Sequence, residues 1–306
     1  MSDFSKKEHI TAFAKSYAKL NLDLRVGKFD ETRKLHEVES DFVLIDYYES
    51  LRFEIIFLND EPGSFAFRTF PEEQHCRLPE DNLMFRAAKK WSEAIGVGLD
   101  VKVFHDDNVP TMRGFGIASS NAARMLRVLD DEYSNMIRIK FKSNCNSNQS
   151  DLTEDERKII SRRIAISLGS DVAFFFEGAS FAKVKGFGDV VIPYSSSLDQ
   201  MYLIAIPPIA ISTAKSFAML YENGVKKFNR FSEIECYIEQ RKWLEKQTGT
   251  AGWRLTGTGS AHFIANPKSK TIQKCKAEVE RNGSNIRLIL AGTPKELMPG
   301  TRLELA

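Results

Sequence analysis

The chain has little of several features that mark specialised protein classes. Its four cysteines, Cys76, Cys145, Cys236 and Cys275, are far apart and form no CxxC pair, which argues against a zinc site and a disulfide framework. No stretch approaches the ~20 apolar residues that a membrane helix needs. The first residues contain no apolar core of the kind found in signal peptides. We therefore expect a reduced, cytoplasmic protein without a membrane partner.

A large excess of one charge is also missing. The chain has 43 Lys and Arg against 41 Asp and Glu, a formal net charge of +2, so composition gives no sign of a nucleic-acid partner. Hydrophobic residues make up 42% and charged residues 27%, which is typical of globular proteins. A length of 306 residues favours about two domains.

Hydrophobic periodicity predicts a mixed fold. Alternation with a period of two predicts strands, at 17–26, 51–57 and 99–104. Helical spacing predicts four helices, at 83–95, 122–129, 154–167 and 234–246. Because strands and helices do not alternate regularly, we expect an α+β fold and not a doubly wound sheet. A polar break at 193–197 predicts a domain boundary and hence domains of 1–194 and 195–306.

Segment 109–123 is the most informative local stretch. Small residues lead from a predicted strand into a helix expected to begin near Asn121. Backbone N–H groups at a helix start suit an anion, and Gly114 and Gly116 would let a phosphate approach closely. Ser119 and Ser120 would cap the helix or reach a metal ion. A glycine turn before a serine-capped helix, with no ligand, explains the segment equally well, since it is neither a Walker A loop nor a dinucleotide fingerprint.

Two other segments have ordinary local interpretations. The glycine loop 255–261 precedes an apolar run and predicts a tight turn before a strand. In segment 168–176 a single acid, Asp171, precedes apolar residues, a pattern typical of a helix N-cap. Lys19 lies in a predicted strand and by itself indicates an exposed lysine. None of these residues implies chemistry alone.

Taken in order, however, these segments resemble the GHMP family of small-molecule kinases. The resemblance covers about residues 17–263 and rests on five segments, namely 18–22 (AKLNL), 79–88 (PEDNLMFRAA), 110–123, 168–175 (LGSDVAFF) and 255–261 (LTGTGSA). The loop carries two more residues before its serine pair than most of the family, Ile117 and Ala118. That spacing is typical of the branch whose substrate bears a cytidyl group.

The resemblance implies ATP-dependent phosphorylation of an alcohol hydroxyl on a small molecule. Asp171 would take the proton of the hydroxyl or orient it, and Lys19 would offset charge on the transferred phosphate. Mg²⁺ would bridge the phosphates with Ser120 as the nearest side chain, and no dedicated metal site in the protein is expected. The implied partner is a small molecule, and the chain would be a monomer or a homodimer.

The resemblance also implies a fold and two sets of binding residues. The fold has an N-terminal domain of a type shared with ribosomal proteins and a ferredoxin-like C-terminal domain, with the site in the cleft between them. The nucleotide-binding residues would be Asn82, Pro110, Gly114, Phe115, Gly116, Ile117, Ala118, Ser119 and Ser120. The substrate-binding residues would be Asn21, His36, Thr213 and Phe217.

The chain departs from the family at two places. Its phosphate loop is poorer in glycine, and Leu35 replaces a tyrosine that would stack on cytosine. On local pattern alone His36 is equally an exposed residue at a strand end, and Phe217 equally a helix core aromatic. The departures leave two alternatives, another GHMP kinase acting on homoserine or a mevalonate derivative, and a ligand-binding member without catalysis.

Overall fold

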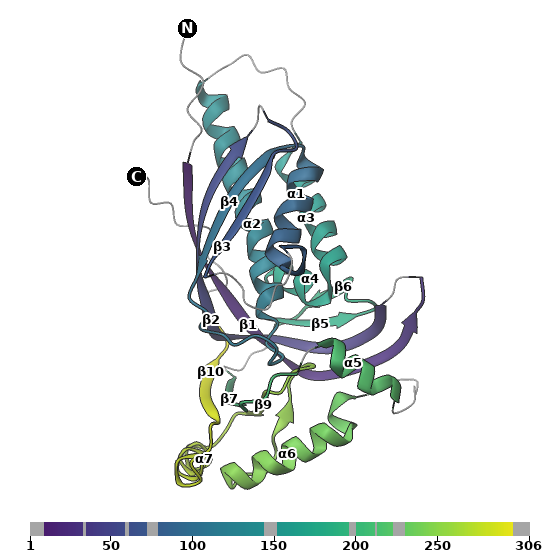
Figure 1. The fold of residues 1–306 in the computed structure, drawn as a ribbon, viewed down its shortest axis with the longest axis vertical. Helices are drawn as coiled ribbons and strands as arrows, with labels where there is room; N and C mark the ends of the chain where they lie inside the picture. Colours follow the sequence, from purple (N-terminus) through teal and green to yellow (C-terminus); the bar gives the residue numbers. More distant parts are fainter. Residues whose placement is uncertain are drawn as a thin grey trace.

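A computed structural model describes residues 9–32, 35–58, 61–71, 79–143, 152–195, 200–211, 213–222 and 230–295. The described residues form two sheets, one above the other in Figure 1. The first has strand order β3-β4-β2-β5-β6, with β1 beside β2. Its strands are β1 (His9–Asp30), β2 (Leu35–Leu58), β3 (Phe65–Phe70), β4 (Gly98–His105), β5 (Phe181–Lys185) and β6 (Val190–Pro193).

The long antiparallel hairpin of β1 and β2 is the central element of the first sheet. The second part of β2 pairs with β4, while residues 40–43 pair with β5. The pairing of β1 with β2 shifts register between Tyr17 and Ala18, between Asn21 and Asp23, and between Val26 and Phe29. Such shifts increase strand twist and re-aim side chains. Two of them flank the short stretch that carries Lys19.

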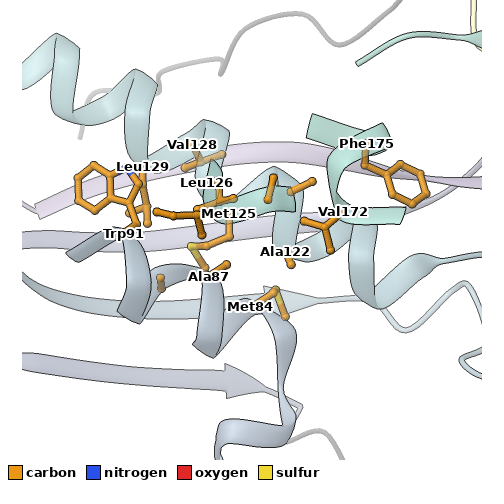
Figure 2. Packing of buried hydrophobic residues seen from close by; sticks show 14 of the residues in the cluster. Met84, Ala87, Trp91, Ala122, Met125, Leu126, Val128, Leu129, Val172 and Phe175 are labelled. Carbon is orange, nitrogen blue, oxygen red and sulfur yellow. The ribbon is translucent and has the colours of Figure 1, made fainter. Parts of the chain in front are cut away.

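Helices α1 (Leu83–Ile95), α2 (Ile117–Ser143), α3 (Glu154–Leu168) and α4 (Ser170–Glu177) cover one face of this sheet (Figure 1). Figure 2 shows how apolar side chains of α1, α2 and α4 gather in one cluster, with Trp91, Leu126 and Val172 among its fully buried members. Burying apolar surface contributes about 25 cal/mol per Å², so this cluster is a main source of stability for the helical layer.

Helix boundaries follow local chemistry in two cases and depart from the prediction in another. Asn82 caps α1, and Thr153 caps α3 in a full capping box with Glu156. The predicted helix 122–129 is wrong in extent. It belongs to α2, which begins at Ile117 and is 27 residues long. The segment expected to lead into the helix is thus its first turn.

A buried polar cluster ties the helices of this layer together. The Oδ1 atom of Asp130 accepts hydrogen bonds from Trp91 Nε1 of α1, at 2.7 Å, and from Ser161 Oγ of α3, at 2.9 Å. Oδ2 has no hydrogen-bond partner among the described residues, and Asp130 is only 4% exposed. Burial raises the pKa of this carboxyl to about 6. The folded state therefore disfavours the ionised form of the Asp130 carboxyl relative to the unfolded chain.

The raised pKa predicts how stability depends on pH. Because the folded protein binds this proton more tightly than the unfolded chain, stability falls as pH rises from about 4 through about 6. We expect Asp130→Asn to flatten this decline by on the order of 2–3 kcal/mol between pH 4.5 and 8. Urea unfolding at the two pH values measures it, with exposed Glu93→Gln on α1 as the control. An unchanged slope in Asp130→Asn would contradict the assignment.

The second sheet has order β10-β7-β9-β8, and every neighbouring pair is antiparallel. Its strands are β7 (Met201–Ile206), β8 (Arg254–Leu255), β9 (His262–Ala265) and β10 (Arg287–Gly292). They are joined through α5 (Thr213–Glu222), α6 (Glu235–Thr248) and α7 (Ser269–Arg281). In chain order this is the 4-1-3-2 arrangement of a ferredoxin-like unit. The expected α+β class and the ferredoxin-like second half are confirmed.

The two sheets share an apolar core along the β1–β2 hairpin. Leu20 and Val43 of the hairpin pack in one buried cluster with Tyr202, Ile204 and Phe263 of the second sheet. The first sheet ends at Pro193 and the second begins at Met201, although the division at 194 stays a prediction. Across the described ranges, no helix has the length and apolar character to cross a membrane. The hairpin thus forms a common wall, and Lys19 lies on it.

Candidate active site

A cavity of about 700 Å³ opens where the two halves meet. Lys19 of β1, Asp171 of α4, Gly259 of the loop between β8 and β9, and the loop before α2 all line it. Nine residues singled out from the sequence are on its wall, namely Lys19, Pro110, Gly114, Phe115, Gly116, Ile117, Ala118, Ser119 and Asp171. Four segments that are remote in sequence therefore meet at a single concave surface.

Lys19 and Asp171 form an ion pair at the base of the loop. The Lys19 Nζ atom lies 3.3 Å from Asp171 Oδ2 and donates to the side-chain oxygen of Asn21 and the carbonyl of Gly114. Lys19 is 3% exposed, so the interpretation as an exposed strand lysine is wrong. A buried ammonium needs several partners to offset lost hydration, and these three oxygens supply them.

Asp171 lies in the first turn of α4, one residue after the helix begins. The N-cap is Gly169, which makes no side-chain cap hydrogen bond, so the interpretation of Asp171 as an N-cap is wrong. Positive charge at a helix N-terminus favours a carboxylate there. The Asp171 side chain keeps 29% of its surface exposed, and it lines the cavity. It is held by Lys19 yet open to a ligand.

Glycine is required at two positions where backbone comes close to other groups. Gly116 has φ +69°, and a Cβ there would lie 3.0 Å from both Asp171 Oδ2 and Lys19 Cε. Gly114 has φ +92°, and a Cβ there would lie 2.1 Å from the carbonyl oxygen of Thr256. The Lys19 N–H donates to the carbonyl of Phe115 at 3.0 Å. The loop is thus fixed directly against the ion pair.

The loop between β8 and β9 clamps this arrangement from the other half. The backbone N–H of Asn21 donates to Thr256 Oγ1 at 2.9 Å, and the Ala261 N–H donates to the Arg113 carbonyl at 3.1 Å. The Asn21 amide also donates to Ser40 Oγ at 2.9 Å. The segment 255–261 therefore holds both Asn21 and the phosphate loop, as part of the site and not as a simple turn.

The two serines of the loop differ in their surroundings. Because α2 begins at Ile117, both lie inside its first turn, and the predicted capping role is wrong. Ser120 Oγ accepts from Ser16 Oγ at 2.8 Å, is buried, and does not line the cavity, whereas Ser119 does. Among the described residues no group of three or more His, Cys, Asp or Glu side chains is placed to hold a metal ion.

Sequence reasoning missed a polar wall of the same cavity. Asn121 Nδ2 donates to Glu49 Oε2 at 2.8 Å, and burial raises the pKa of the Glu49 carboxyl. The Oδ1 atom of Asn121 is buried and finds no hydrogen-bond partner in the part of the chain that the structure describes, and both residues line the cavity. His105 and Asp107, paired at 2.9 Å, line it as well. The sequence offered one signal for Asn121, its position directly after the serine pair. It offered none for Glu49, which lies in an ordinary strand segment.

Asn82 is placed at the edge of the cavity but not on its wall. Its side-chain oxygen accepts from the backbone N–H groups of Met84 and Phe85, and the residue is 6% exposed. Its neighbours Asp81 and Leu83 line the cavity. Asn82 therefore fixes the start of α1, and residues at this start form one rim of the cavity.

The predicted base-binding residues lie together outside this cavity. The rings of His36, from β2, and Phe217, from α5, are stacked with centroids 4.9 Å apart and an angle of 23°. His36 is half-buried, its Nδ1 lies 3.2 Å from the Gly27 carbonyl, and Phe217 packs edge-on against Phe231. The side chains of Leu35 and Thr213 lie outside the described residues, although Thr213 begins α5.

Comparison with known proteins identifies the family. No family model matches the chain. The 4-diphosphocytidyl-2-C-methyl-D-erythritol kinase of Francisella philomiragia is 28% identical over 289 residues, which are 87% of this chain and 92% of the relative. The kinase of that name from Blochmanniella pennsylvanica is 32% identical over 250 residues, 74% and 75% of the two chains. The chain belongs to the 4-diphosphocytidyl-2-C-methyl-D-erythritol kinase family.

Solved structures agree on the fold of this kinase family. The crystal structure of a 4-(cytidine 5'-diphospho)-2C-methyl-D-erythritol kinase matches with a TM-score of 0.61 at 20% identity, over 92% of this chain and 100% of that one. Homoserine kinase from Cytophaga hutchinsonii matches with a TM-score of 0.62 at 11% identity, over 98% and 99%. Their low identities establish the shared fold alone, and the expected GHMP kinase architecture is confirmed.

Proposed function

We propose that the protein transfers the γ-phosphoryl group of ATP to the 2-hydroxyl of 4-diphosphocytidyl-2-C-methyl-D-erythritol. The observation that carries this function is the Lys19–Asp171 pair, 3.3 Å apart, on the wall of a cavity of about 700 Å³ beside a glycine loop. The same chain belongs to a family whose curated members have that name. The site thus combines a carboxylate, an ammonium and a glycine loop on one cavity wall.

Asp171 would act on the attacking hydroxyl. Its partly exposed carboxylate accepts the hydroxyl hydrogen bond and orients the oxygen toward the γ-phosphorus. The new O–P bond forms as the bond to the oxygen bridging the β- and γ-phosphates breaks, and the hydroxyl proton passes to Asp171 and then to solvent. Lys19 holds the carboxylate in place through the ion pair. Phosphoryl transfer depends mainly on this kind of positioning.

The loop before α2 would hold the triphosphate. Gly114 and Gly116 let the loop lie directly against Thr256 and the Lys19–Asp171 pair, and the first turn of α2 directs N–H groups toward negative charge. Lys19 adds a fixed positive charge at the transferred group. Bound Mg²⁺ would offset charge on the phosphates. It usually keeps several waters, so single oxygens suffice as protein contacts. The Ser119 hydroxyl, on the cavity wall, takes the place that the sequence assigned to Ser120, which is buried away from the wall.

The polar side of the cavity formed by Asn121 and Glu49 offers a reason for nucleotide selectivity. The Oδ1 atom of Asn121, which accepts from none of the described residues, can accept a hydrogen bond from a donor on the nucleotide, and Glu49 fixes the orientation of the amide. An unpaired buried acceptor costs about 1–3 kcal/mol, which a ligand donor would recover. This supports an occupant of the cavity that carries hydrogen-bond donors as well as phosphates.

The stacked His36 and Phe217 rings would form the base end of the substrate site. Their centroid distance of 4.9 Å leaves no room for a third ring between them, so cytosine would stack on an outer face or separate the pair. We expect Phe217→Ala to raise KM for the cytidyl substrate about tenfold with KM for ATP unchanged, since base stacking on an aromatic contributes ~1–3 kcal/mol. Steady-state kinetics with each substrate varied measures it, and Phe13→Ala at an exposed position is the control.

An ATP consumption assay tests the function and its alternatives together. Purified protein is given the cytidyl substrate, homoserine or mevalonate in parallel. Turnover on the cytidyl substrate alone supports the proposal. Turnover on homoserine or mevalonate instead would keep the phosphoryl-transfer chemistry but refute the substrate. Tight binding of a nonhydrolysable ATP analogue without turnover on any alcohol would favour a ligand-binding member of the fold.

A further inference from the structure

The loop before α2 begins with three residues larger than glycine. Thr111, Met112 and Arg113 precede Gly114, and all three line the cavity of about 700 Å³. Thr111 and Met112 are exposed, and Met112 adopts φ +56°, a conformation that favours glycine. Arg113, in contrast, is half-buried. It is therefore the residue of this stretch whose side chain the protein partly encloses.

The Arg113 guanidinium has buried donors without partners. Its Nε and Nη1 atoms are buried and meet no hydrogen-bond acceptor among the described residues, and no described carboxylate forms an ion pair with it. Burial lowers the pKa of this guanidinium, which still stays charged at neutral pH. Buried donors in folded proteins are almost always paired, and an unpaired one costs free energy that a ligand acceptor would recover.

The backbone of Arg113 is fixed against the loop between β8 and β9. Its carbonyl accepts from the Ala261 N–H at 3.1 Å, and Gly259 lies so close to its carbonyl carbon that a Cβ there would clash. The next residue, Gly114, carries the carbonyl that accepts from Lys19 Nζ at 3.1 Å. The Arg113 side chain is therefore attached at a fixed point, one residue from a partner of the catalytic ammonium.

The wall of the cavity offers few free cations for a triphosphate. Four of its described residues are acidic, namely Glu49, Asp81, Asp107 and Asp171. The Lys and Arg side chains among them are those of Lys19 and Arg113, and Lys19 is already paired with Asp171 at 3.3 Å. Within the described part of the wall, Arg113 is thus the lysine or arginine that has no carboxylate partner.

We propose that the Arg113 guanidinium binds the triphosphate of ATP as a further ligand of the phosphate loop. The nucleotide as the ligand rests on the proposed function, whereas the preference for a phosphate-bearing anion rests on the unpaired guanidinium. Guanidinium N–H groups form strong, charge-assisted hydrogen bonds to phosphate oxygens. Arg113 adds such donors to the backbone N–H groups of α2, in a loop that is poor in glycine.

Calorimetry with two ligands tests this role without requiring catalysis. A nonhydrolysable ATP analogue and adenosine, which lacks the phosphates, are titrated into the parent, Arg113→Gln, Arg113→Lys and Arg138→Gln. The last variant makes the same charge change at an exposed position near the other end of α2. We expect Arg113→Gln to weaken the analogue at least tenfold with adenosine binding unchanged, Arg113→Lys to weaken it less, and Arg138→Gln to match the parent. Equal binding of the analogue by Arg113→Gln and the parent would overturn the proposal.

Thermal unfolding distinguishes a ligand contact from a structural one. Because the buried Arg113 donors have no described partners, ligand-free Arg113→Gln should keep a Tm at or above the parental value. The ATP analogue should raise its Tm by less than it raises the parental Tm, since the affinity is lower. A lowered Tm in the ligand-free variant would show that the guanidinium stabilises the fold, and would overturn the proposal.

Steady-state kinetics connect the contact to the reaction. We expect Arg113→Gln to raise KM for ATP at least tenfold, with KM for the cytidyl substrate unchanged. An equal rise in both constants would indicate a general disturbance of the cavity and contradict a specific contact with the triphosphate. Absence of turnover in the parent would refute the proposed function, while the calorimetric comparison would still decide whether Arg113 binds the phosphates.

Discussion

Replacing Asp171 with asparagine is expected to lower kcat by about 10²–10⁴-fold, the usual contribution of a positioned general base. The amide keeps the shape of the side chain and its place in the first turn of α4, but it cannot take the hydroxyl proton. KM for either substrate should change by no more than a few-fold, because the interaction is made with the reacting atoms in the transition state. Steady-state rates with ATP and the cytidyl substrate measure both constants.

The control for this variant lies on the same helix. Glu177→Gln removes a carboxylate at the end of α4 that pairs with Arg162 at the surface, at 2.5 Å. It should leave kcat unchanged, so a general disturbance of α4 is separated from loss of the base. Turnover by Asp171→Asn within a few-fold of the parent would show that Asp171 does not serve as the base.

Removal of the Lys19 charge is the second large effect. We expect Lys19→Met to lower kcat by about 10²–10³-fold, as loss of one charged stabiliser of a transition state commonly does. Methionine preserves most of the buried volume but leaves Asp171 without its 3.3 Å partner. Lys19→Arg should recover little, because Asn21, Gly114 and Gly257 enclose the ammonium closely.

Two measurements distinguish the loss of the Lys19 charge from misfolding of the variant. Lys15→Met, on an exposed part of the same strand, should retain parental kcat. Binding of a nonhydrolysable ATP analogue to Lys19→Met, followed by calorimetry, should confirm that the nucleotide cavity is still formed. Near-parental kcat in a folded Lys19→Met protein would remove the lysine from the mechanism.

The sequence located the catalytic candidates only through the order of several motifs. Lys19 in isolation looked exposed, because strand periodicity cannot show what closes over a side chain. Its partners Gly114 and Asp171 lie far along the chain, and burial arises when the loops of both halves fold onto β1. The ion pair forms only in the tertiary structure, so a local sequence pattern cannot predict it.

The extent of the elements was harder to predict for a related reason. Strand β1 runs from His9 to Asp30, whereas the predicted strand covers 17–26, and register shifts interrupt its pairing with β2 at three places. Helix α2 continues past 129 into Asp130, a buried acid that accepts hydrogen bonds from neighbouring helices, and no count of apolar residues registers such a position. Glu49 escaped notice in the same way, as a buried acid whose partner comes from a distant helix.

Analysis of the reaction product tests the central claim most directly, that the phosphoryl group moves to the alcohol. The protein is incubated with ATP, Mg²⁺ and 4-diphosphocytidyl-2-C-methyl-D-erythritol, and the isolated product is examined by ³¹P and ¹³C nuclear magnetic resonance. The account predicts one new phosphate monoester resonance, an intact diphosphate, and phosphorus coupling at carbon 2 of the methylerythritol. Cleavage of the diphosphate, or ADP formation without any new monoester, would contradict it.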